Sequence, residues 1–194
     1  AELKADFEWA KSIAVGPGLS MNVAAAEITR CVLERDDKVR ILDADALNII
    51  AGEHIDYKGS REGQIIITPH IMEMSRLTGK TVADIKEHMI ESAKEYAIQH
   101  SCICILKDAR TVVTDGQKVY INCTGNDGMS TGGCGDVLTG LIAGMTAMGL
   151  DAFEAACLSV YVHGKAGDYA ASGKGRAGMT AADVSEAIAY VLKR

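Results

Sequence analysis

Short apolar runs alternate with longer stretches of helical periodicity along the chain. Four of these runs are nearly continuous in apolar residues and stop at turn-forming or polar residues, which is typical of buried strands. They are Ser12–Val15, Val39–Leu42, Ile65–Thr68 and Cys102–Leu106. Two further strands are predicted at Thr111–Thr114 and Lys118–Asn122, because they flank Asp115-Gly116, a dipeptide typical of hairpin turns.

Amphipathic helices are predicted between and after the strands. Ser20 precedes the first helical pattern and is expected to cap it. Thr81 with Asp84 forms a capping-box pattern at the start of a long helix. The predicted helical segments are Met21–Arg35, His70–Gly79, Thr81–Tyr96, Asp136–Met148, Ala152–Ala171 and Ala181–Leu192. This alternation predicts an α/β fold, with a mostly parallel sheet flanked by helices on both faces.

Polar and glycine-rich segments follow the predicted strands. Gly16–Gly18, Asp43–Asp45, Pro69-His70 and Lys107–Thr111 each begin where a strand ends. In open α/β folds the carboxyl ends of the strands form the ligand crevice, so we expect these segments to converge on one site. We see no internal repeat or linker, and residues 1–194 are predicted to form a single domain.

The densest glycine segment covers residues 126–140 and leads into an apolar helical pattern. Gly128, Gly132, Gly133 and Gly135 crowd a loop that a lone carboxylate, Asp136, follows directly. Such glycines let backbone N–H groups approach an anion at a helix N-terminus. Asp136 alone could simply interact favourably with the helix dipole. A simple helix cap does not explain the glycines, however, because each glycine costs backbone entropy on folding. The segment lacks a Walker A lysine, yet it predicts anion binding and phosphoryl chemistry.

Several charged side chains have two interpretations at this stage. Lys107 ends an apolar strand and could bind a nucleotide phosphate or be a solvated strand end. His70 could be functional or structural. The carboxylates of Asp43–Asp45 could bind a metal or fix a turn, and His163 with Asp168 could form a hydrogen-bonded structural pair on one helical face.

Composition excludes several classes of function. The chain has 20 basic and 26 acidic residues, a net charge of −6 and only 5% aromatic residues. It therefore offers no basic surface for nucleic acid and no polybasic membrane anchor. No apolar run reaches the roughly 18 residues of a membrane span, and no signal-peptide pattern is present. The six cysteines lack zinc spacing, which favours reduced, buried thiols in a cytoplasmic protein.

These motifs occur in the order of one known family. The segments concerned are Gly16–Leu19, Leu42–Asn48, Thr68-Pro69-His70 with Glu73, Leu106-Lys107, Gly125–Gly140, Tyr161–Gly164 and Ala166–Asp168. Together they cover essentially the whole chain and closely resemble the ADP/ATP-dependent NAD(P)H-hydrate dehydratases, which are ribokinase-like proteins. The resemblance implies a ribokinase-like fold and the repair of hydrated NADH or NADPH (NADHX or NADPHX). It implies phosphorylation of the ring hydroxyl by ADP or ATP, with Mg²⁺ assisting, followed by loss of phosphate.

The resemblance also implies roles for individual residues. Asp136 would be the general base and face the hydrated substrate, while the amides of Gly132–Gly135 would steady the transferring phosphoryl group. Gly18 and His70 would contact the hydrated dinucleotide. The adenine nucleotide would be bound by Gly135 and by Lys107, Asp108, Ala109, Arg110 and Thr111. No residue is implied as a direct metal ligand.

The chain departs from the family pattern in three respects. Asp108 stands where glycine is usual, which places a carboxylate near phosphate-binding backbone. Cys134 stands where threonine or serine is common, so a hydroxyl contact would be lost. The family's N-terminal glycine-bearing segment has no counterpart in this sequence. We therefore expect an N-terminally incomplete domain, with a separate N-terminal piece of the same protein among its partners. We also expect a homo-oligomer.

Two other functions remain open. A vitamin-precursor kinase of the same superfamily would share the glycine-loop aspartate, and its product would be a stable phosphoester. The Asp43–Asn48 and Thr68–His70 segments favour the dehydratase over this kinase. The third hypothesis is a non-catalytic nucleotide-binding module, which the missing segment supports.

Overall fold

The computed structural model describes residues 2–60 and 64–193. Within that part of the chain, six strands form one sheet in which sequence neighbours are also sheet neighbours. The strands are β1 (Ser12–Val15), β2 (Val39–Leu42), β3 (Ile65–Ile67), β4 (Ile103–Leu106), β5 (Val112–Thr114) and β6 (Val119–Ile121). Strands β1 to β4 run parallel, and β5 and β6 add antiparallel to β4. The predicted strands, the hairpin and the mostly parallel sheet are confirmed.

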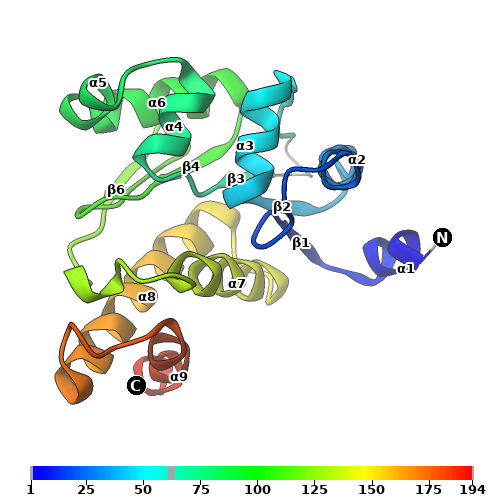
Figure 1. Cartoon of the computed structure of the whole chain (residues 1–194). Helices are drawn as coiled ribbons and strands as arrows, with labels where there is room; N and C mark the ends of the chain where they lie inside the picture. Colours follow the sequence, from blue (N-terminus) through cyan, green and yellow to red (C-terminus); the bar gives the residue numbers. More distant parts are fainter. Residues whose placement is uncertain (1, 61–63, 194) are drawn as a thin grey trace.

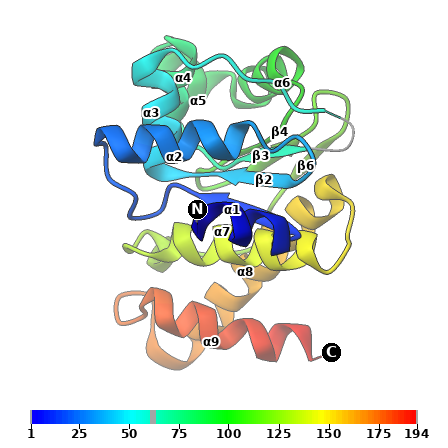
Figure 2. The same cartoon turned by 90° about the vertical axis from the view of Figure 1, so that its right-hand side faces the viewer.

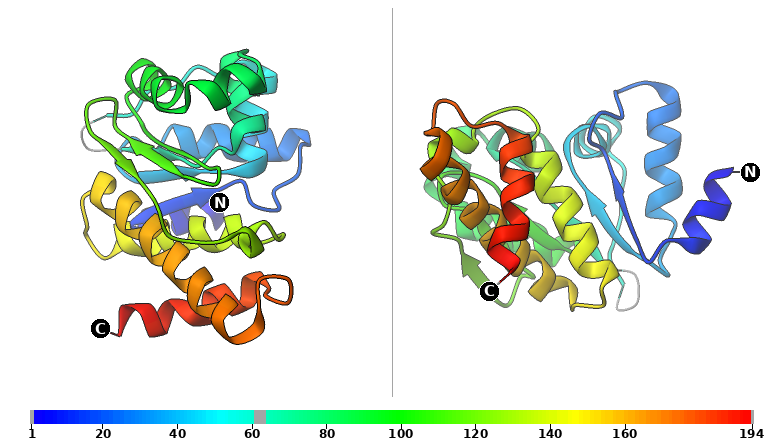
Figure 3. Two further views of the ribbon diagram at one scale, coloured as in Figure 1. Left: turned by 90° about the vertical axis from the view of Figure 1, so that its left-hand side faces the viewer. Right: turned by 90° about the horizontal axis from the view of Figure 1, so that it is seen from below.

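Helices cover both faces of the sheet, as predicted (Figures 1 and 2). One face packs against α2 (Val23–Leu33), α3 (Ala44–Glu53), α4 (Ile71–Thr78), α5 (Val82–Glu87) and α6 (Met89–His100). Right-handed crossovers between consecutive neighbouring strands place all of these helices on the same face. The other face packs against α7 (Cys134–Ala147) and α8 (Ala152–Lys174). Figure 3 shows α9 (Ala181–Leu192) lying on α8 as a further layer, while α1 (Glu2–Trp9) lies beside β1 in Figure 1.

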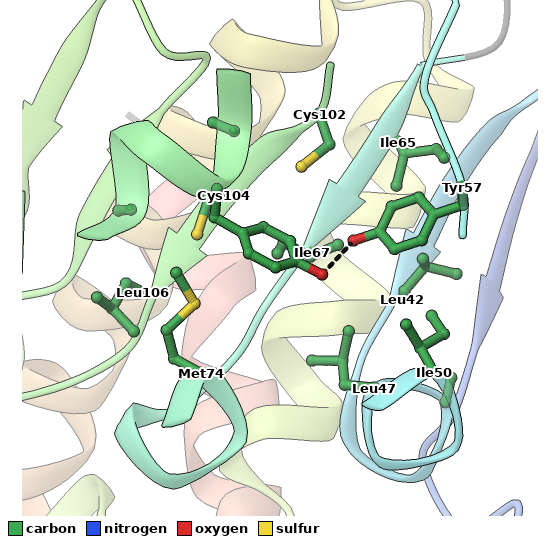
Figure 4. Packing of buried hydrophobic residues seen from close by; sticks show 14 of the residues in the cluster. Leu42, Leu47, Ile50, Tyr57, Ile65, Ile67, Met74, Cys102, Cys104 and Leu106 are labelled. Carbon is green, nitrogen blue, oxygen red and sulfur yellow. Dashed lines mark hydrogen bonds between the residues drawn. The ribbon is translucent and has the colours of Figure 1, made fainter. Parts of the chain in front are cut away.

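The strands are nearly continuous in apolar residues because both sheet faces are buried. Ile41 and Ile66 point toward α7 and α8, whereas their neighbours Leu42 and Ile67 point toward the opposite helices. Each fully buried side chain of this size contributes about 1.5–3 kcal/mol to folding. Figure 4 shows the buried cluster that contains Leu42 and Ile67. In this cluster the hydroxyls of Tyr57 and Tyr96 share a hydrogen bond of 3.0 Å.

Two predicted helix boundaries are wrong. Asn22, and not Ser20, caps α2, because the Asn22 side chain accepts from the N–H of Ala25 at 2.9 Å. Ser20 instead lies in the left-handed region, with φ of +69°. The capping box at Thr81 is confirmed, but the long helix expected after it is broken at His88 into α5 and α6.

Helix α3 was not predicted. Its ten residues begin directly after Asp43, in a segment that the pattern indicated only as a turn. Ala46, Leu47, Ile49 and Ile50 are all buried. Their dense apolar run obscured the helical period, as is common for short buried segments.

The cysteines are all free, but they are not all buried. Cys102, Cys104 and Cys134 are buried, whereas Cys31 and Cys123 are exposed. The expectation of buried thiols is therefore wrong for Cys31 and Cys123. In the described ranges, no helix combines the length and the apolar character needed to cross a membrane.

Candidate active site

The segments that follow β1 to β4 come together at one edge of the sheet, as predicted. The Asp43 N–H donates to the Val15 carbonyl at 3.1 Å, which joins the ends of β1 and β2. The Lys107 N–H donates to the Pro69 carbonyl at 2.8 Å, which joins the ends of β3 and β4. Since strands in parallel pairing end together, the four loops lie along the same end of the sheet, and those that carry Asp43 and Lys107 face the start of α7.

A buried carboxylate organises this edge. Asp43 Oδ1 lies 3.0 Å from the Lys107 ammonium, and Asp43 Oδ2 accepts from the Thr139 hydroxyl at 2.7 Å. The Asp43 side chain is only 2% exposed, while that of Lys107 is 22% exposed. Asp43 therefore acts as a counter-ion that joins β2, β4 and α7. The cationic partner satisfies a charge that would otherwise be costly to bury.

The glycine loop ends in an uncapped helix start. Helix α7 begins at Cys134, two residues before the predicted start, after Gly133 in a left-handed conformation with φ of +90°. Within residues 2–60 and 64–193, no side chain caps this end. A Cβ atom on Gly135 would lie 3.6 Å from the Lys107 ammonium nitrogen and 3.9 Å from Asp43 Oδ2. The first turn of α7 therefore faces the ion pair. The Cys134 N–H donates to the Thr131 carbonyl at 3.4 Å, so the N–H groups that follow it in this turn are the ones placed to meet an anion.

Asp136 lies in this first turn and is exposed. Among the described residues, its carboxylate has no hydrogen-bond or ion-pair partner. Thr139, which contacts Asp43, follows one helical turn later. A free carboxylate at an anion-binding helix start can accept a proton from a bound hydroxyl group.

The side chain of Cys134 points away from this surface. It is buried in a cluster with Ala166, Ala170 and Met179, between α7, α8 and the segment before α9. Burial raises the pKa of the Cys134 thiol. The residue therefore offers the site its backbone only, and a hydroxyl group in the same orientation would be buried as well.

The Gly-Pro-Gly segment forms a tight turn against β2. The Leu19 N–H donates to the Gly16 carbonyl at 3.0 Å, and Gly18 has φ of +66°, as position three of a type II turn requires. A Cβ atom on Gly16 would lie 1.7 Å from the Asp43 carbonyl oxygen, so a larger residue does not fit. Asp45 accepts from the Ser20 N–H at 2.7 Å and fixes this turn to α3.

His70 caps α4 rather than lying free in the crevice. The ring atom Nδ1 of His70 accepts from the backbone N–H groups of Met72 and Glu73, at 3.1 and 3.2 Å. The backbone N–H of His70 donates to the Glu73 carboxylate at 2.8 Å. Glu73 is buried, and burial raises its pKa, although the His70 N–H and Lys107 act in the opposite direction. About half of the His70 side chain remains exposed, so it can still reach a ligand.

The turn between β4 and β5 carries the remaining predicted nucleotide contacts. Thr111 accepts from the Asn122 N–H at 2.9 Å through its carbonyl group, and its hydroxyl lies 3.5 Å from the Asp108 carbonyl oxygen. Asp108, Ala109 and Arg110 are exposed beside Lys107. Their accessibility agrees with a binding role, which stays a prediction.

The expected pair of His163 and Asp168 does not form. Asp168 instead accepts from the Gly125 N–H and the Asn126 side-chain amide, both at 3.1 Å, and so holds the start of the glycine loop. His163 Nε2 is buried without a hydrogen-bond partner among the described residues. Burial lowers the pKa of His163 to about 4 and keeps the ring neutral.

Three residues of this site had no assigned role at the sequence level. Thr139 gave no signal, because a threonine within an apolar helix has no characteristic spacing. Asp43 was recognised only as an open alternative between metal binding and turn formation. Glu73 carried the clearest signal, since His70 three residues earlier gives the spacing of a capping box.

Comparisons with known proteins show to which family the chain is similar. The sequence profile described as NAD(P)H-hydrate dehydratase matches residues 1–190. A bifunctional NAD(P)H-hydrate repair enzyme, Nnr, from Moorella thermoacetica is 45% identical over 183 residues, which is 93% of this chain and 34% of that protein. An ADP-dependent (S)-NAD(P)H-hydrate dehydratase from Neisseria meningitidis is 35% identical, over 93% of this chain and 62% of that protein.

Two solved structures are also similar. The ADP/ATP-dependent NAD(P)H-hydrate dehydratase from Bacillus subtilis, co-crystallised with ATP/Mg²⁺ and soaked with CoA, aligns with a TM-score of 0.85 and 33% identity, over 95% of this chain and 66% of that one. A ribokinase-like superfamily protein from Enterococcus faecalis aligns with a TM-score of 0.87 and 27% identity, over 98% and 66% of the two chains. The chain thus spans about a third of the Moorella relative and two thirds of these structures.

The fold and the glycine-loop site define an α/β protein of the ribokinase-like class. Because the family profile covers nearly all of its residues, the chain belongs to the NAD(P)H-hydrate dehydratase family.

Proposed function

We propose that this chain catalyses the ADP-dependent dehydration of hydrated NADH or NADPH. The observation that carries the proposal is the first turn of α7, where the unpartnered Asp136 follows Gly135 and Gly135 faces the Lys107 ammonium. A proton acceptor and a phosphate-binding cation therefore meet at one anion-binding helix start. The activities named for the Neisseria and Bacillus relatives support this choice of substrate.

The proposed chemistry converts a poor leaving group into a good one. Asp136 accepts the proton of the ring hydroxyl while the hydroxyl oxygen attacks the terminal phosphorus of ADP. The bond from that phosphorus to the bridging oxygen breaks, and AMP leaves. Phosphate then departs from the ring carbon with the electrons of the C–O bond, and the adjacent carbon loses a proton to restore the double bond. Hydrated dinucleotide and ADP thus give reduced dinucleotide, AMP and phosphate.

The other site residues bind and orient the two substrates. Lys107 and the turn Asp108–Thr111 bind the nucleotide phosphates, and the amides of Gly132–Gly135 hold the phosphoryl group as charge develops on its oxygens. Gly18 and His70 contact the hydrated dinucleotide. Asp43 keeps the Lys107 ammonium beside the start of α7.

Mg²⁺ is proposed as an assisting ion. In the described ranges, no group of three or more His, Cys, Asp or Glu residues gathers to hold a metal ion. The chain therefore fits an ion held mainly by the nucleotide phosphates, which is how Mg²⁺ commonly binds in such sites. When bound, it would neutralise phosphate charge. We also propose a cytoplasmic location, which the six free cysteines support.

The proposal is tested by incubating the chain with purified NADHX or NADPHX and ADP while following the absorbance of the dihydronicotinamide ring. Asp136→Asn keeps the size of the side chain but removes the base, so kcat is expected to fall about 10²–10⁴-fold. Asp56→Asn, at another exposed carboxylate, is the matched control. Unchanged turnover in Asp136→Asn contradicts the proposed mechanism.

The same assay separates the alternatives. A stable phosphoester without a restored dinucleotide would identify a small-molecule kinase. Nucleotide binding with no turnover of either kind would identify a non-catalytic binding module.

A further inference from the structure

A pocket of about 460 Å³ lies beside α3. Its lining comes from the segment before α2, from α3 and from α4, which gather at one side of the view in Figure 2. The lining residues are Met21, Asn48, Ala51, Gly52 and Arg76. The pocket therefore combines small apolar walls with one amide and one cation, a composition typical of sites for small organic ligands.

The cation of this pocket is oriented without being neutralised. Arg76 Nη1 donates to the Asn48 side-chain carbonyl at 2.7 Å, and the Asn48 amide donates to the Ala44 carbonyl at 3.2 Å. In the described part of the chain Arg76 has no carboxylate partner, whereas Arg30 on the neighbouring α2 pairs with Glu53. The guanidinium group thus retains its full charge and further N–H donors, which suit a phosphate oxygen.

The pocket continues from the segment proposed to contact the dinucleotide. The Ser20 N–H donates to Asp45, so the Gly16–Ser20 turn is fixed to the first turn of α3. Met21 follows this turn directly. At a rise of about 1.5 Å per residue, Asn48 lies about 4.5 Å and Gly52 about 10.5 Å beyond Asp45 along α3. A ligand that passes the turn therefore reaches the pocket next.

We propose that this pocket binds a phosphate group on the far nucleotide of NADHX or NADPHX, the nucleotide without the reacting ring. Arg76 donates to the phosphate oxygens, and Ala51, Gly52 and Met21 line the adjoining apolar wall. The inference rests on the proposed function and sets the direction in which the dinucleotide lies, from Asp136 past Gly18 to Arg76.

The first test compares Arg76→Gln with Arg30→Gln in steady-state assays. Arg76→Gln is expected to raise KM for the hydrated dinucleotide about five- to tenfold, the effect of one partly solvated charged hydrogen bond. kcat and KM for ADP should not change, because Arg76 binds the ground state and the transition state equally. Arg30→Gln should change neither KM. Loss of affinity for NADPHX alone would place Arg76 at the additional phosphate that only this substrate carries.

A second test uses Gly52, where an added Cβ meets no atom within 4 Å. Gly52→Glu and Gly52→Lys add side chains of similar helix propensity and opposite charge. The glutamate should raise KM for the dinucleotide and the lysine should lower or preserve it. This pair keeps the inference testable if Arg76 variants fold poorly.

The outcomes separate the inference from the function on which it rests. An inactive wild-type chain contradicts the proposed function, and calorimetric titration of the same variants with the hydrated dinucleotide still tests the pocket. An active chain whose dinucleotide KM is unaffected at both positions overturns the inference. A rise in KM for ADP, and not for the dinucleotide, would assign the pocket to ADP and overturn the inference as well.

Discussion

The hydroxyl of Thr139 donates a hydrogen bond of 2.7 Å to the Asp43 carboxylate, which holds Lys107 through its other oxygen. This arrangement connects the helix that carries Asp136 to the strand that carries the lysine. Asp136, the proposed base, and the Lys107 ammonium group are therefore both connected to the buried Asp43, and a change at Asp43 or Thr139 should affect both.

Thr139→Val removes the hydroxyl group while keeping the shape of the side chain. Asp43 then loses one of its two partners, and we expect KM for ADP to rise about tenfold as Lys107 loses its fixed position. Thr146→Val is the matched control, because the Thr146 hydroxyl bonds only to carbonyls of its own helix. Steady-state rates at varied ADP concentration give KM for each variant, and an equal rise in KM in both variants would contradict the role of Thr139.

Gly16→Ala should destabilise the protein far more than Gly18→Ala. Both glycines have positive φ, but only at Gly16 would the new Cβ overlap the Asp43 carbonyl. Gly18→Ala should cost about 1–2 kcal/mol for the left-handed conformation alone, and Gly16→Ala should add the cost of displacing the turn. Urea unfolding of the two variants gives the comparison, and similar midpoints would contradict the close approach.

Stability should fall between about pH 6.5 and pH 4 because of His163. Burial lowers its pKa to about 4 in the folded chain, so the unfolded chain binds the proton first as the pH falls. The neutral ring contributes its full share of the free energy of unfolding above the pKa of the unfolded chain, which is about 6.5. That contribution, up to about 3 kcal/mol, is lost as the pH falls from about 6.5 to about 4.

His163→Gln should therefore flatten the decline in unfolding free energy over this pH range. His88→Gln, which removes an exposed histidine, serves as the control variant. A slope that is identical in wild type and His163→Gln would show that other groups cause the acid sensitivity.

The rate at which each cysteine is alkylated should depend on how deeply its thiol is buried. Cys31 and Cys123 are exposed and should react first with iodoacetamide, whereas burial raises the pKa of Cys102 to about 12 and of Cys157 to about 11. Cys134 should react slowly and only as the protein opens. Mass spectrometry of the labelled peptides measures the order, and rapid labelling of Cys134 would contradict its inward orientation.

The strands and the convergence of their ends could be predicted from the sequence because buried parallel strands leave continuous apolar runs. Helix α3 could not, since a short helix that is apolar on most sides has no clear period. The break at His88 was also missed, because the apolar spacing continues across it from Ile85 to Ala93.

The site was predictable where its chemistry lies in local motifs. The glycine loop and Lys107 are recognisable from their positions after strands. Contacts between distant segments were not predictable: Thr139 reaches Asp43 across 96 positions, and Asp168 turned out to hold Gly125 and not His163. Such pairings depend on how the helices pack, which a single sequence does not specify.

The pairing of Lys107 with Asp43 also bears on how the products leave. An anion that enters the site must compete with the Asp43 carboxylate for the Lys107 ammonium group. A single phosphate ion therefore gains less binding free energy there than a nucleotide that several residues contact. In the proposed mechanism, Asp43 takes back the ammonium group once the terminal phosphate of ADP has been transferred and released. If the proposed function holds, the ion pair therefore favours turnover over product inhibition by inorganic phosphate.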